Sequence, residues 1–463
     1  MCLNLNLVSG FADDSRKVGP GFVFFVINGK VINGVEFIDE AIRNGASDIV
    51  LEEGLEIITK DGINYHFVKD VRKELAIFAS VFYKRKPKNI VAVTGTNGKT
   101  STVDFFRQIC ILTMGGGASI GTLGLKSSAY NKKTPLTTPP SIILNQELNK
   151  LAESGIEYVA LEASSHGLDQ KRLDGLEIRV GAFTNFSLDH LDYHLSSSAY
   201  LRAKLRLFNE LINETAVMYD SFDVVDEVIN VCKGRGLRVI QYGKSRGSDL
   251  FLEYDNSNCY ITIFNDKFPF DIDLSGDFQK INLMCAIAMA IACGIDKSDI
   301  LNVISKIKNV DGRFEKIATI NGADFFVDFA HTPDAVYTIL SEAKKFCNGR
   351  IISVIGCGGD RDKSKRLIMG NVSAKYSDLV IVTDDNPRNE NPSSIRKEII
   401  SGIINRDYVE IADRKLAIKA AAEIAEEGDV VFILGKGHEC GQIIKGIEYE
   451  HNDKEEILKI LNS

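Results

Sequence analysis

The chain has 463 residues, a length that is typical of about three domains of roughly 150 residues each. Hydrophobic residues make up 44% of it and charged residues 25%, which is the balance of a soluble globular protein. The formal net charge of −8 and the sequence pI of about 5.6 argue against sequence-independent binding to nucleic acid, because such binding needs a basic surface. We therefore expect a multidomain globular protein without a nucleic-acid partner.

The nine cysteines are scattered along the chain, and no two of them form a Cys-x-x-Cys pair. This pattern predicts reduced, mostly buried thiols and neither a disulfide framework nor a zinc site. No apolar run reaches the roughly 18 residues that a membrane-spanning helix needs, and the N-terminus lacks the basic-then-apolar pattern of a signal peptide. The sequence therefore predicts a cytoplasmic protein with no membrane partner.

Three predicted domains cover residues 1–88, 89–311 and 312–463. In the first, short apolar runs such as 22–27 alternate with Asn-Gly and Gly-rich turns, which predicts short strands. The basic, proline-containing stretch 83–88 precedes a buried strand and is interpreted as a solvated linker, since polar stretches of this kind are typical of domain boundaries.

The second and third domains alternate short apolar runs, typical of buried parallel strands, with helical stretches. This rhythm predicts an α/β fold with an open, doubly wound sheet, in which ligands bind at the carboxyl ends of strands. The predicted elements are a strand at 89–94, a helix ending near 114, strands at 158–163 and 180–184, antiparallel strands within 249–275, a helix at 282–293 ended by a glycine, and strands at 325–328, 351–355, 379–382 and 430–434.

A glycine-rich loop, Gly-Thr-Asn-Gly-Lys-Thr at residues 95–100, follows the first strand of the second domain and opens a helix. Glycines let backbone N–H groups approach an anion, and the helix N-terminus adds its positive dipole end. Lys99 suits the β- and γ-phosphates of a nucleotide, and the Thr100 hydroxyl suits Mg²⁺. The loop is shorter than the general P-loop, since Val93 stands where that pattern has its first glycine. A plain glycine-rich turn is the alternative, which the strand–loop–helix context disfavours.

Further polar side chains follow two later strands. Glu162 ends the strand at 158–163, where a carboxylate suits a hard cation, although a solvated loop residue is the commoner interpretation. The next strand is followed by two aspartates and two histidines within six residues: Asp189, His190, Asp192 and His194. This concentration favours a functional site over turn and capping residues. Lys204 lies on a predicted amphipathic helix at 199–208, and taken alone it is interpreted as an exposed helix lysine.

These motifs, in this order, resemble those of the Mur ligases. The shared motifs are Gly-Thr-Asn-Gly-Lys-Thr at 95–100, Glu-Ala-Ser-Ser-His-Gly-Leu at 162–168, Thr-Asn-x-x-x-Asp-His-Leu-Asp-Tyr-His at 184–194 and Ala-His-Thr-Pro-Asp at 330–334. Three later motifs resemble the MurE branch of that family: Gly-Cys-Gly-Gly-Asp-Arg-Asp at 356–362, Asp-Asp-Asn-Pro-Arg at 384–388 and Gly-Lys-Gly-His-Glu at 435–439. The chain departs from the family pattern at Leu195 and Leu367, where glycine and proline are expected.

The resemblance implies three α/β domains: an N-terminal domain for the uridine nucleotide, a P-loop-type central domain for ATP and a Rossmann-like C-terminal domain for an amino acid. It implies that the D-glutamate γ-carboxylate of UDP-MurNAc-L-Ala-D-Glu takes the γ-phosphate of ATP. An amino group then attacks the acyl phosphate. The expected protein is therefore a monomeric, cytoplasmic ligase that makes peptidoglycan precursors for cell-wall growth, cell shape and division.

The resemblance also implies roles for single residues. It gives catalytic roles to Lys99, Glu162, His190 and Lys204, and magnesium binding to Thr100, Glu162, His190 and Lys204. Lys204 is expected to carry a carbamate derived from CO₂, which requires a neutral amine and surroundings that lower its pKa. The implied ATP-binding residues are Gly95, Thr96, Asn97, Gly98, Lys99, Thr100, Ser101, Asn282, Arg313 and Asp328.

Two further sets of residues are implied for the other substrates. The expected UDP-MurNAc-dipeptide contacts are Ser15, Thr137, Thr138, Ser164, Gln170 and Arg172. The expected amino-acid contacts are Arg361, Asp385, Asn386, Pro387, Arg388, Gly435 and Glu439. In the family, the Asp-Asn-Pro-Arg form goes with meso-diaminopimelate, and the planar fork of Arg388 suits its distal carboxylate. A loop arginine in a structural salt bridge is the plain alternative for Arg388.

Several other functions remain open at this point. The same reaction with meso-lanthionine or L-lysine as the amine is the nearest alternative. A folylpolyglutamate synthetase-type ligase would share the ATP loop but lack the motifs at 385–388 and 435–439. A catalytically silent nucleotide-binding protein would have lost Glu162, His190 or Lys204, and this chain retains all three.

Overall fold

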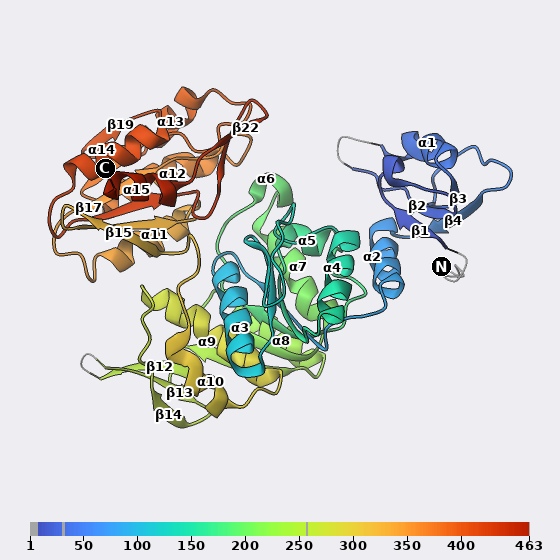
Figure 1. Cartoon of the computed structure of the whole chain (residues 1–463), viewed down its shortest axis with the longest axis horizontal. Coiled ribbons are helices and arrows are strands. Elements are labelled where there is room, and N and C mark those ends of the chain that lie inside the picture. The colour runs from blue at the N-terminus through green and yellow to red at the C-terminus, as the bar shows by residue number, and fades with distance from the viewer. Residues whose placement is uncertain (1–7, 30–32, 256–257, 463) are drawn as a thin grey trace.

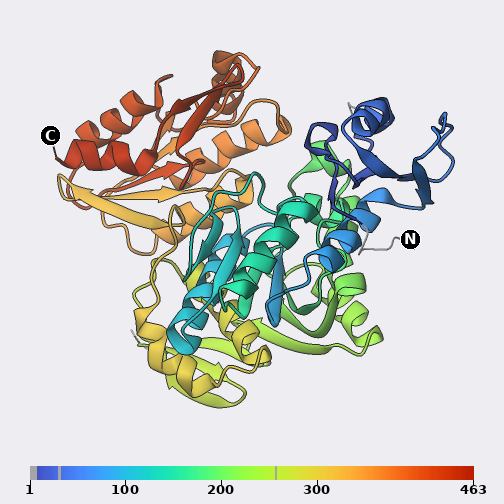
Figure 2. The same ribbon diagram turned by 45° about the vertical axis from the view of Figure 1, so that its right-hand side comes forward.

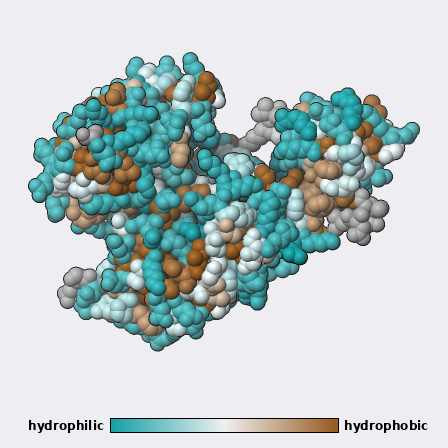
Figure 3. Space-filling view, viewed as in Figure 1, coloured by the Kyte–Doolittle hydropathy of each residue, from teal (hydrophilic) through white to brown (hydrophobic). Residues whose placement is uncertain are grey.

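The computed structural model describes residues 8–29, 33–255 and 258–462. The central domain joins two outer domains, which lie on the same side of it in two views of the molecule (Figure 1 and Figure 2). A hollow separates the C-terminal domain from the N-terminal domain above the central one, and hydrophilic residues cover most of the visible face (Figure 3).

The N-terminal domain is a parallel sheet with one helix on each face. Its strands follow the order β1 (Gly10–Ala12), β2 (Phe22–Phe25), β3 (Ala46–Glu52) and β4 (Asn64–Val68). Successive strand residues point to opposite faces: Val23 and Phe25 pack with the side of α2 (Val71–Phe82), whereas Phe24 packs with the side of α1 (Ile38–Arg43). The strand predicted at 22–27 is thus found, ending at Phe25.

A ten-stranded sheet forms the central domain, in the order β14-β13-β12-β11-β10-β9-β5-β8-β6-β7. Its strands are β5 (Asn89–Thr94), β6 (Ala118–Gly121), β7 (Gly124–Ser127), β8 (Tyr158–Glu162), β9 (Ile178–Phe183), β10 (Ile212–Tyr219), β11 (Arg238–Gly243), β12 (Leu250–Asp255), β13 (Asn258–Ile263) and β14 (Asp266–Pro269). Its helices are α3 (Lys99–Met114), α4 (Ser141–Glu153), α5 (Ser165–Asp169), α6 (Leu191–His194), α7 (Ser197–Arg206), α8 (Val225–Gly234), α9 (Asp277–Ala292) and α10 (Lys297–Val303).

The central sheet is buried on both faces. Val91 and Val93 of β5 pack with α3 and α9, whereas Ile90 and Ala92 pack with the helices of the opposite face. The predicted strands at 89–94, 158–163 and 180–184, and the antiparallel strands within 249–275, are confirmed. The helix predicted to begin at 282 begins at Asp277 instead, because Asp277, Gln279 and Lys280 interrupt the apolar run that marks the rest of the helix.

A six-stranded sheet in the order β15-β16-β20-β17-β18-β19 forms the C-terminal domain. The strands are β15 (Glu315–Ile320), β16 (Ala323–Asp328), β17 (Ile351–Ile355), β18 (Leu379–Val382), β19 (Tyr408–Glu410) and β20 (Val430–Leu434), and a hairpin adds β21 (Gly441–Ile444) and β22 (Ile447–Glu450). The helices α11 (Pro333–Ala343), α12 (Ser364–Tyr376) and α13 (Pro392–Ile400) cover one face, and α14 (Arg414–Ile424) and α15 (Asp453–Leu461) cover the other.

The order of this sheet places the polar motifs together. Strand β20 lies between β16 and β17 and is parallel to both, so the loops after these strands leave the same edge of the sheet. Those loops carry the motifs at 330–334, 356–362 and 435–439. The carboxyl edge of the sheet is where open α/β sheets bind ligands.

The expectations for thiols and membranes can be compared with the described part of the chain. The eight cysteines in it are all free. No helix within residues 8–29, 33–255 and 258–462 combines the length and apolar character needed to cross a bilayer.

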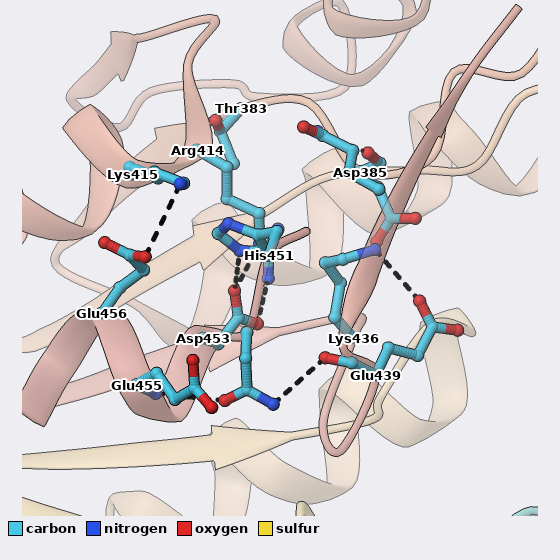
Figure 4. A network of polar contacts seen from close by, with 12 residues as sticks. Thr383, Asp385, Arg414, Lys415, Lys436, Glu439, His451, Asp453, Glu455 and Glu456 are labelled. Carbon is cyan, nitrogen blue, oxygen red and sulfur yellow. Dashed lines mark hydrogen bonds and ion pairs between the residues drawn. The ribbon is translucent and has the colours of Figure 1, made fainter. Parts of the chain in front are cut away.

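A buried ion pair joins the two helices on one face of the C-terminal sheet (Figure 4). The Arg414 guanidinium donates to both carboxylate oxygens of Asp453 at 2.7 Å and to the carbonyl oxygen of Leu434 at 3.0 Å. His451 Nε2 lies 2.7 Å from the same carboxylate. Burial raises the pKa of Asp453, but Arg414 and His451 hold it well below its usual range. The pair therefore anchors the end of β20, just before Gly435.

We predict that Asp453→Asn lowers the free energy of unfolding by about 3–5 kcal/mol, because it leaves the Arg414 cation buried without its counter-charge. Chemical denaturation of the full chain measures the change. Lys415→Met is the matched control: its ammonium is half exposed and lies 3.7 Å from Glu456, and exposed pairs contribute only about 0–1 kcal/mol. Equal losses in the two variants would contradict the assignment.

Candidate active site

A cavity of about 570 Å³ lies where the central and C-terminal domains meet. It brings together twenty of the predicted site residues: Thr96, Asn97, Gly98, Lys99, Thr100, Ser101, Thr137, Glu162, Ser164, His190, Lys204, Asn282, Arg313, Asp328, Arg361, Asp385, Asn386, Arg388, Gly435 and Glu439. The remaining predicted residues lie outside its wall: Ser15, Gly95, Thr138, Gln170, Arg172 and Pro387. One cavity therefore joins the phosphate loop to the amino-acid motifs.

The phosphate loop connects the fully buried β5 to α3. Gly95 and Gly98 have φ angles of 140° and 84°, a region that glycine occupies without the strain of a side chain. A side chain at position 98 would also collide with Asn282 of α9. The loop thus leaves backbone amides facing the cavity at the start of α3, where the helix dipole favours an anion.

Two lysines, one half-buried and one fully buried, converge on the loop. Lys99 Nζ donates to the carbonyl oxygens of Gly95 and Thr96, both at 2.8 Å, and Lys204 Nζ donates to the same Gly95 oxygen at 2.7 Å. Lys204 is only 1% exposed, so its interpretation as an exposed helix lysine is wrong: α7 turns this side chain toward the loop. Burial and the Lys99 charge lower the pKa of Lys204 well below its ordinary value.

Glu162 is held at the end of β8 by residues of the turn after β6. The backbone N–H of Thr122 donates to Glu162 Oε1 at 2.8 Å, and the Thr122 hydroxyl donates to Oε2 at 3.1 Å. The Thr122 and Thr137 hydroxyls lie 3.3 Å apart. The carboxylate is therefore fixed in place, with its charge facing the cavity that contains the Thr100 hydroxyl.

The C-terminal domain contributes a cation to the phosphate loop. Arg313 Nη2 donates to Thr100 Oγ1 at 2.9 Å, and the guanidinium lies 4.5 Å from the centre of the Phe329 ring. Asp328 accepts from the backbone N–H groups of Phe314 and Ala330, at 2.7 and 2.6 Å. Burial raises the pKa of Asp328 to about 6, against the lowering effect of Arg313.

Asp334 makes a second contact between these domains. Its Oδ2 accepts from Asn97 Nδ2 at 3.0 Å and from the Ser187 hydroxyl at 3.1 Å. The side chain comes from the first turn of α11, and both donors belong to the central domain. Together with Arg313, it brings the C-terminal domain directly against the phosphate loop.

His190 lies at the cavity wall, at the N-terminal end of α6. Burial lowers the pKa of His190 to about 4, although Asp189 acts in the opposite direction. The imidazole is therefore neutral near pH 7, as a metal ligand must be. The rings of His166 and His190 lie 4.8 Å apart, edge to face.

The amino-acid motifs form a second polar cluster on the opposite side of the cavity. Lys436 is fully buried, and its ammonium donates to Asn386 Oδ1 and Glu439 Oε2, both at 3.0 Å. Asn386 Nδ2 also donates to Glu439 at 3.0 Å. Figure 4 shows Lys436 and Glu439 side by side, with Asp385 nearby. These three hydrogen bonds hold the Glu439 carboxylate in place at the cavity.

Arg388 presents its guanidinium to the same cavity. Its backbone has φ = 50° and is held by hydrogen bonds with Ile443 and Lys445 of the β21–β22 hairpin. The side chain donates only to carbonyl oxygens, with Gly359 at 2.8 Å. No carboxylate pairs with it within the described chain, so the salt-bridge alternative does not describe this arginine.

The predicted acceptor contacts divide into two places. Thr138 Oγ1 donates to the Glu162 carbonyl oxygen at 2.6 Å and lies 2.9 Å from the Ser164 hydroxyl, and Arg172 donates to the Thr138 carbonyl at 2.6 Å. Gln170 accepts from Arg172 at 2.6 Å. Of these residues, Ser164 lines the cavity, and Thr138, Gln170 and Arg172 lie outside its wall, linked to it through these hydrogen bonds. Ser15 instead lies in the N-terminal domain, where its hydroxyl contacts Glu40 at 2.5 Å.

Comparison with known proteins adds an independent finding. The Mur ligase middle domain matches residues 93–290, and the Mur ligase, glutamate ligase domain matches residues 312–437. UDP-N-acetylmuramoyl-L-alanyl-D-glutamate--2,6-diaminopimelate ligase of Bradyrhizobium diazoefficiens is 40% identical over 468 residues, which cover 98% of this chain and 95% of the relative. The chain belongs to the Mur ligase family. The predicted membership is confirmed.

Two further relatives match nearly the whole length of this Mur ligase. The protein of the same name from Agrobacterium fabrum is 38% identical over 462 residues, covering 98% of this chain and 93% of the relative. A solved structure of UDP-N-acetylmuramoyl-L-alanyl-D-glutamate--2,6-diaminopimelate ligase is 32% identical, with a TM-score of 0.69 and coverage of 98% and 95% of the two chains. The predicted three-domain architecture is that of these relatives.

The donor set of this Mur ligase suits magnesium. Within residues 8–29, 33–255 and 258–462, no three His, Cys, Asp or Glu side chains form a metal-binding group. Mg²⁺ commonly takes one or two protein oxygens and completes its shell with phosphate oxygens and water. The fixed Glu162 carboxylate and the Thr100 hydroxyl, beside the phosphate loop, are ligands of that kind.

Sequence reasoning missed four residues that line the cavity of this Mur ligase or hold its side chains in place. His331 and Asp334 lie within the motif at 330–334, and Lys436 lies within the motif at 435–439, so these motifs contained the signal. Thr122 lies in a short turn between β6 and β7 without any recognisable pattern. Of the two departures from the family pattern, Leu195 has φ = 63°, which explains why glycine is expected there.

Proposed function

We propose that this Mur ligase uses ATP to join meso-diaminopimelate to the D-glutamate γ-carboxylate of UDP-MurNAc-L-Ala-D-Glu, in peptidoglycan precursor synthesis. One observation carries the proposal: a single cavity contains both a phosphate loop and a pocket with fixed charges of both signs. The named relatives support the choice of substrates, since they are ligases for this acceptor and 2,6-diaminopimelate.

ATP binding is assigned to the phosphate loop and its surroundings. The loop amides and the N-terminus of α3 receive the phosphates. Lys99 would move from the loop carbonyls to the β- and γ-phosphates, and Asn282, which lines the cavity beside the loop, would contact the adenosine. Arg313, which now contacts Thr100, adds positive charge at the transferred phosphoryl group. Magnesium held by Thr100 and Glu162 would neutralise phosphate charge.

The acceptor carboxylate is assigned to the side of the cavity formed by Thr137, Ser164 and His190. Positioning and charge neutralisation are the main needs of phosphoryl transfer, so the protein supplies little covalent chemistry. Lys204 would serve as a carbamate, an anion suited to a second magnesium beside His190. Burial and the Lys99 charge lower the pKa of this amine, which favours the neutral form that reaction with CO₂ requires.

The incoming amino acid is assigned to the cluster on the C-terminal domain. Glu439 and Asp385 provide negative charge for ammonium groups, and Arg388 provides a planar fork for a carboxylate. A substrate with a distal carboxylate beside an ammonium uses both charges. This favours diaminopimelate, or meso-lanthionine of the same charge pattern, over L-lysine.

A ligation assay tests the function. The purified chain, ATP, magnesium and UDP-MurNAc-L-Ala-D-Glu are mixed separately with meso-diaminopimelate, meso-lanthionine and L-lysine, and the products are identified by mass. We expect a tripeptide product with diaminopimelate, and ADP release only when acceptor and amine are both present. No tripeptide with any amine would overturn the proposal and return attention to the folylpolyglutamate-type reaction.

We predict that Arg388→Met lowers kcat/KM for diaminopimelate about 10- to 100-fold, since a hydrogen bond to a charged group contributes about 1.5–3 kcal/mol. Any turnover of L-lysine, which lacks the distal carboxylate, should be unaffected. The control is Arg406→Met, which removes a cation of the same domain that bonds to the Ala374 carbonyl. Steady-state kinetics measure the change. A kcat/KM for diaminopimelate in Arg388→Met equal to that of the wild type would count against the assignment.

A further inference from the structure

One cation that lines the cavity, Lys365, has no hydrogen-bond or ion-pair partner within the described chain, and the proposed reaction gives it no role so far. Lys365 lies in the first turn of α12, is half-buried and lines the cavity. Its ammonium makes no hydrogen bond or ion pair within the described chain. Its neighbours differ: Lys363 pairs with Glu390 at 3.3 Å, and Arg366 donates to Glu390 at 2.9 and 3.0 Å.

The charge of Lys365 acts on the phosphate-loop side of the cavity. The pKa of Asp189 lies below its usual value, because His331, His190 and Lys365 together outweigh the effect of burial, and all these groups line the same cavity. Burial lowers the pKa of His331, and Lys365 is the charged group that lowers it most. Asp189 belongs to the central domain and His331 to the loop after β16, so the ammonium faces the junction between the two domains.

A different cation serves the amino-acid cluster. Burial and the nearby charge of Arg361 both lower the pKa of Arg388. Arg361 and Arg388 therefore form the cationic part of the amino-acid pocket. Lys365 lines the same cavity as this pocket and the phosphate loop, and its charge acts on residues at the phosphate-loop side.

We propose that Lys365 is a further catalytic residue, whose ammonium donates to the carbonyl oxygen of the acyl phosphate while the amine attacks. The proposal rests on the proposed function. It follows from an unpaired, half-buried cation on the wall of the cavity that the phosphate loop and the amino-acid pocket share.

The step balances without any further reactant. The neutral amine forms a C–N bond to the carbonyl carbon, and the carbonyl π electrons move to the oxygen, which becomes an oxyanion beside Lys365. When the oxyanion collapses, the C–O bond to phosphorus breaks and phosphate leaves with the electron pair. The proton lost by the amine nitrogen passes to the departing phosphate. Lys365 stays protonated throughout and stabilises the oxyanion electrostatically, as donors in oxyanion holes do.

The location of Lys365 also makes this stabilisation depend on domain closure. The lysine belongs to the C-terminal domain, whereas the acyl phosphate forms on the central domain. The oxyanion is thus stabilised only when the domains meet, as they do through Arg313 and Asp334. Phosphoryl transfer, which the loop and Glu162 carry, does not need Lys365.

The test measures the two steps of the reaction separately in the full-length enzyme: formation of the acyl phosphate and attack on it by the amine. Lys365→Met retains most of the side-chain length and removes the charge. Ligation is measured with saturating substrates, and acyl phosphate formation is measured without amine, by positional isotope exchange in ATP labelled with ¹⁸O at the β–γ bridge. Lys363→Met is the control two residues away, and Lys365→Arg restores a cation.

We expect Lys365→Met to lower kcat for ligation on the order of 10²-fold, the loss seen when one oxyanion donor is removed. Its isotope exchange should stay within about threefold of the wild type, the scale of a lesion that spares phosphoryl transfer. Lys363→Met should match the wild type, and Lys365→Arg should recover part of the loss. Equal losses of both half-reactions, or ligation by Lys365→Met equal to that of Lys363→Met, would overturn the proposal. A wild-type enzyme that makes no tripeptide would instead refute the proposed function.

Discussion

The site depends on two lysine ammonium groups that share one carbonyl oxygen. Lys99 and Lys204 both donate to Gly95 in a buried loop, although burial of like charges side by side is costly. Burial lowers the pKa of both amines. The neutral amine is thereby favoured, and that reduces the cost. Nucleotide phosphates would neutralise the positive charge of Lys99. A carbamate would turn Lys204 from a competing cation into an anion.

Domain contact is the second constraint on the site. Arg313 and Asp334 cross from the C-terminal domain to Thr100, Asn97 and Ser187 of the central domain. Their contacts bring the amino-acid cluster to the same cavity as the phosphate loop. An acyl phosphate is hydrolysed by water, so assembling the second substrate's pocket by closure protects the intermediate from that loss.

Much of this arrangement could be predicted from the sequence. The strand at 89–94 and the loop at 95–100 carry strong local patterns, and most residues of the family motifs line one cavity in the structure. The burial of Lys204 could not be predicted, because an amphipathic helix does not say which neighbour covers its polar side. Thr122 could not be predicted either, since its role arises from the pairing of β6 with β8. Lys436 and the Arg414–Asp453 pair depend on long-range packing of the C-terminal sheet.

The carbamate on Lys204 is the central claim, because the charge balance of the loop depends on it. ¹³C NMR of the enzyme in ¹³C-bicarbonate tests it most directly. We expect a bound carbamate resonance in the wild type and its loss in Lys204→Met. Arg202→Met, which changes an exposed residue of the same helix, should keep the resonance. An enzyme that ligates without any such resonance, or a resonance that persists in Lys204→Met, would contradict the assignment of a carbamate to Lys204.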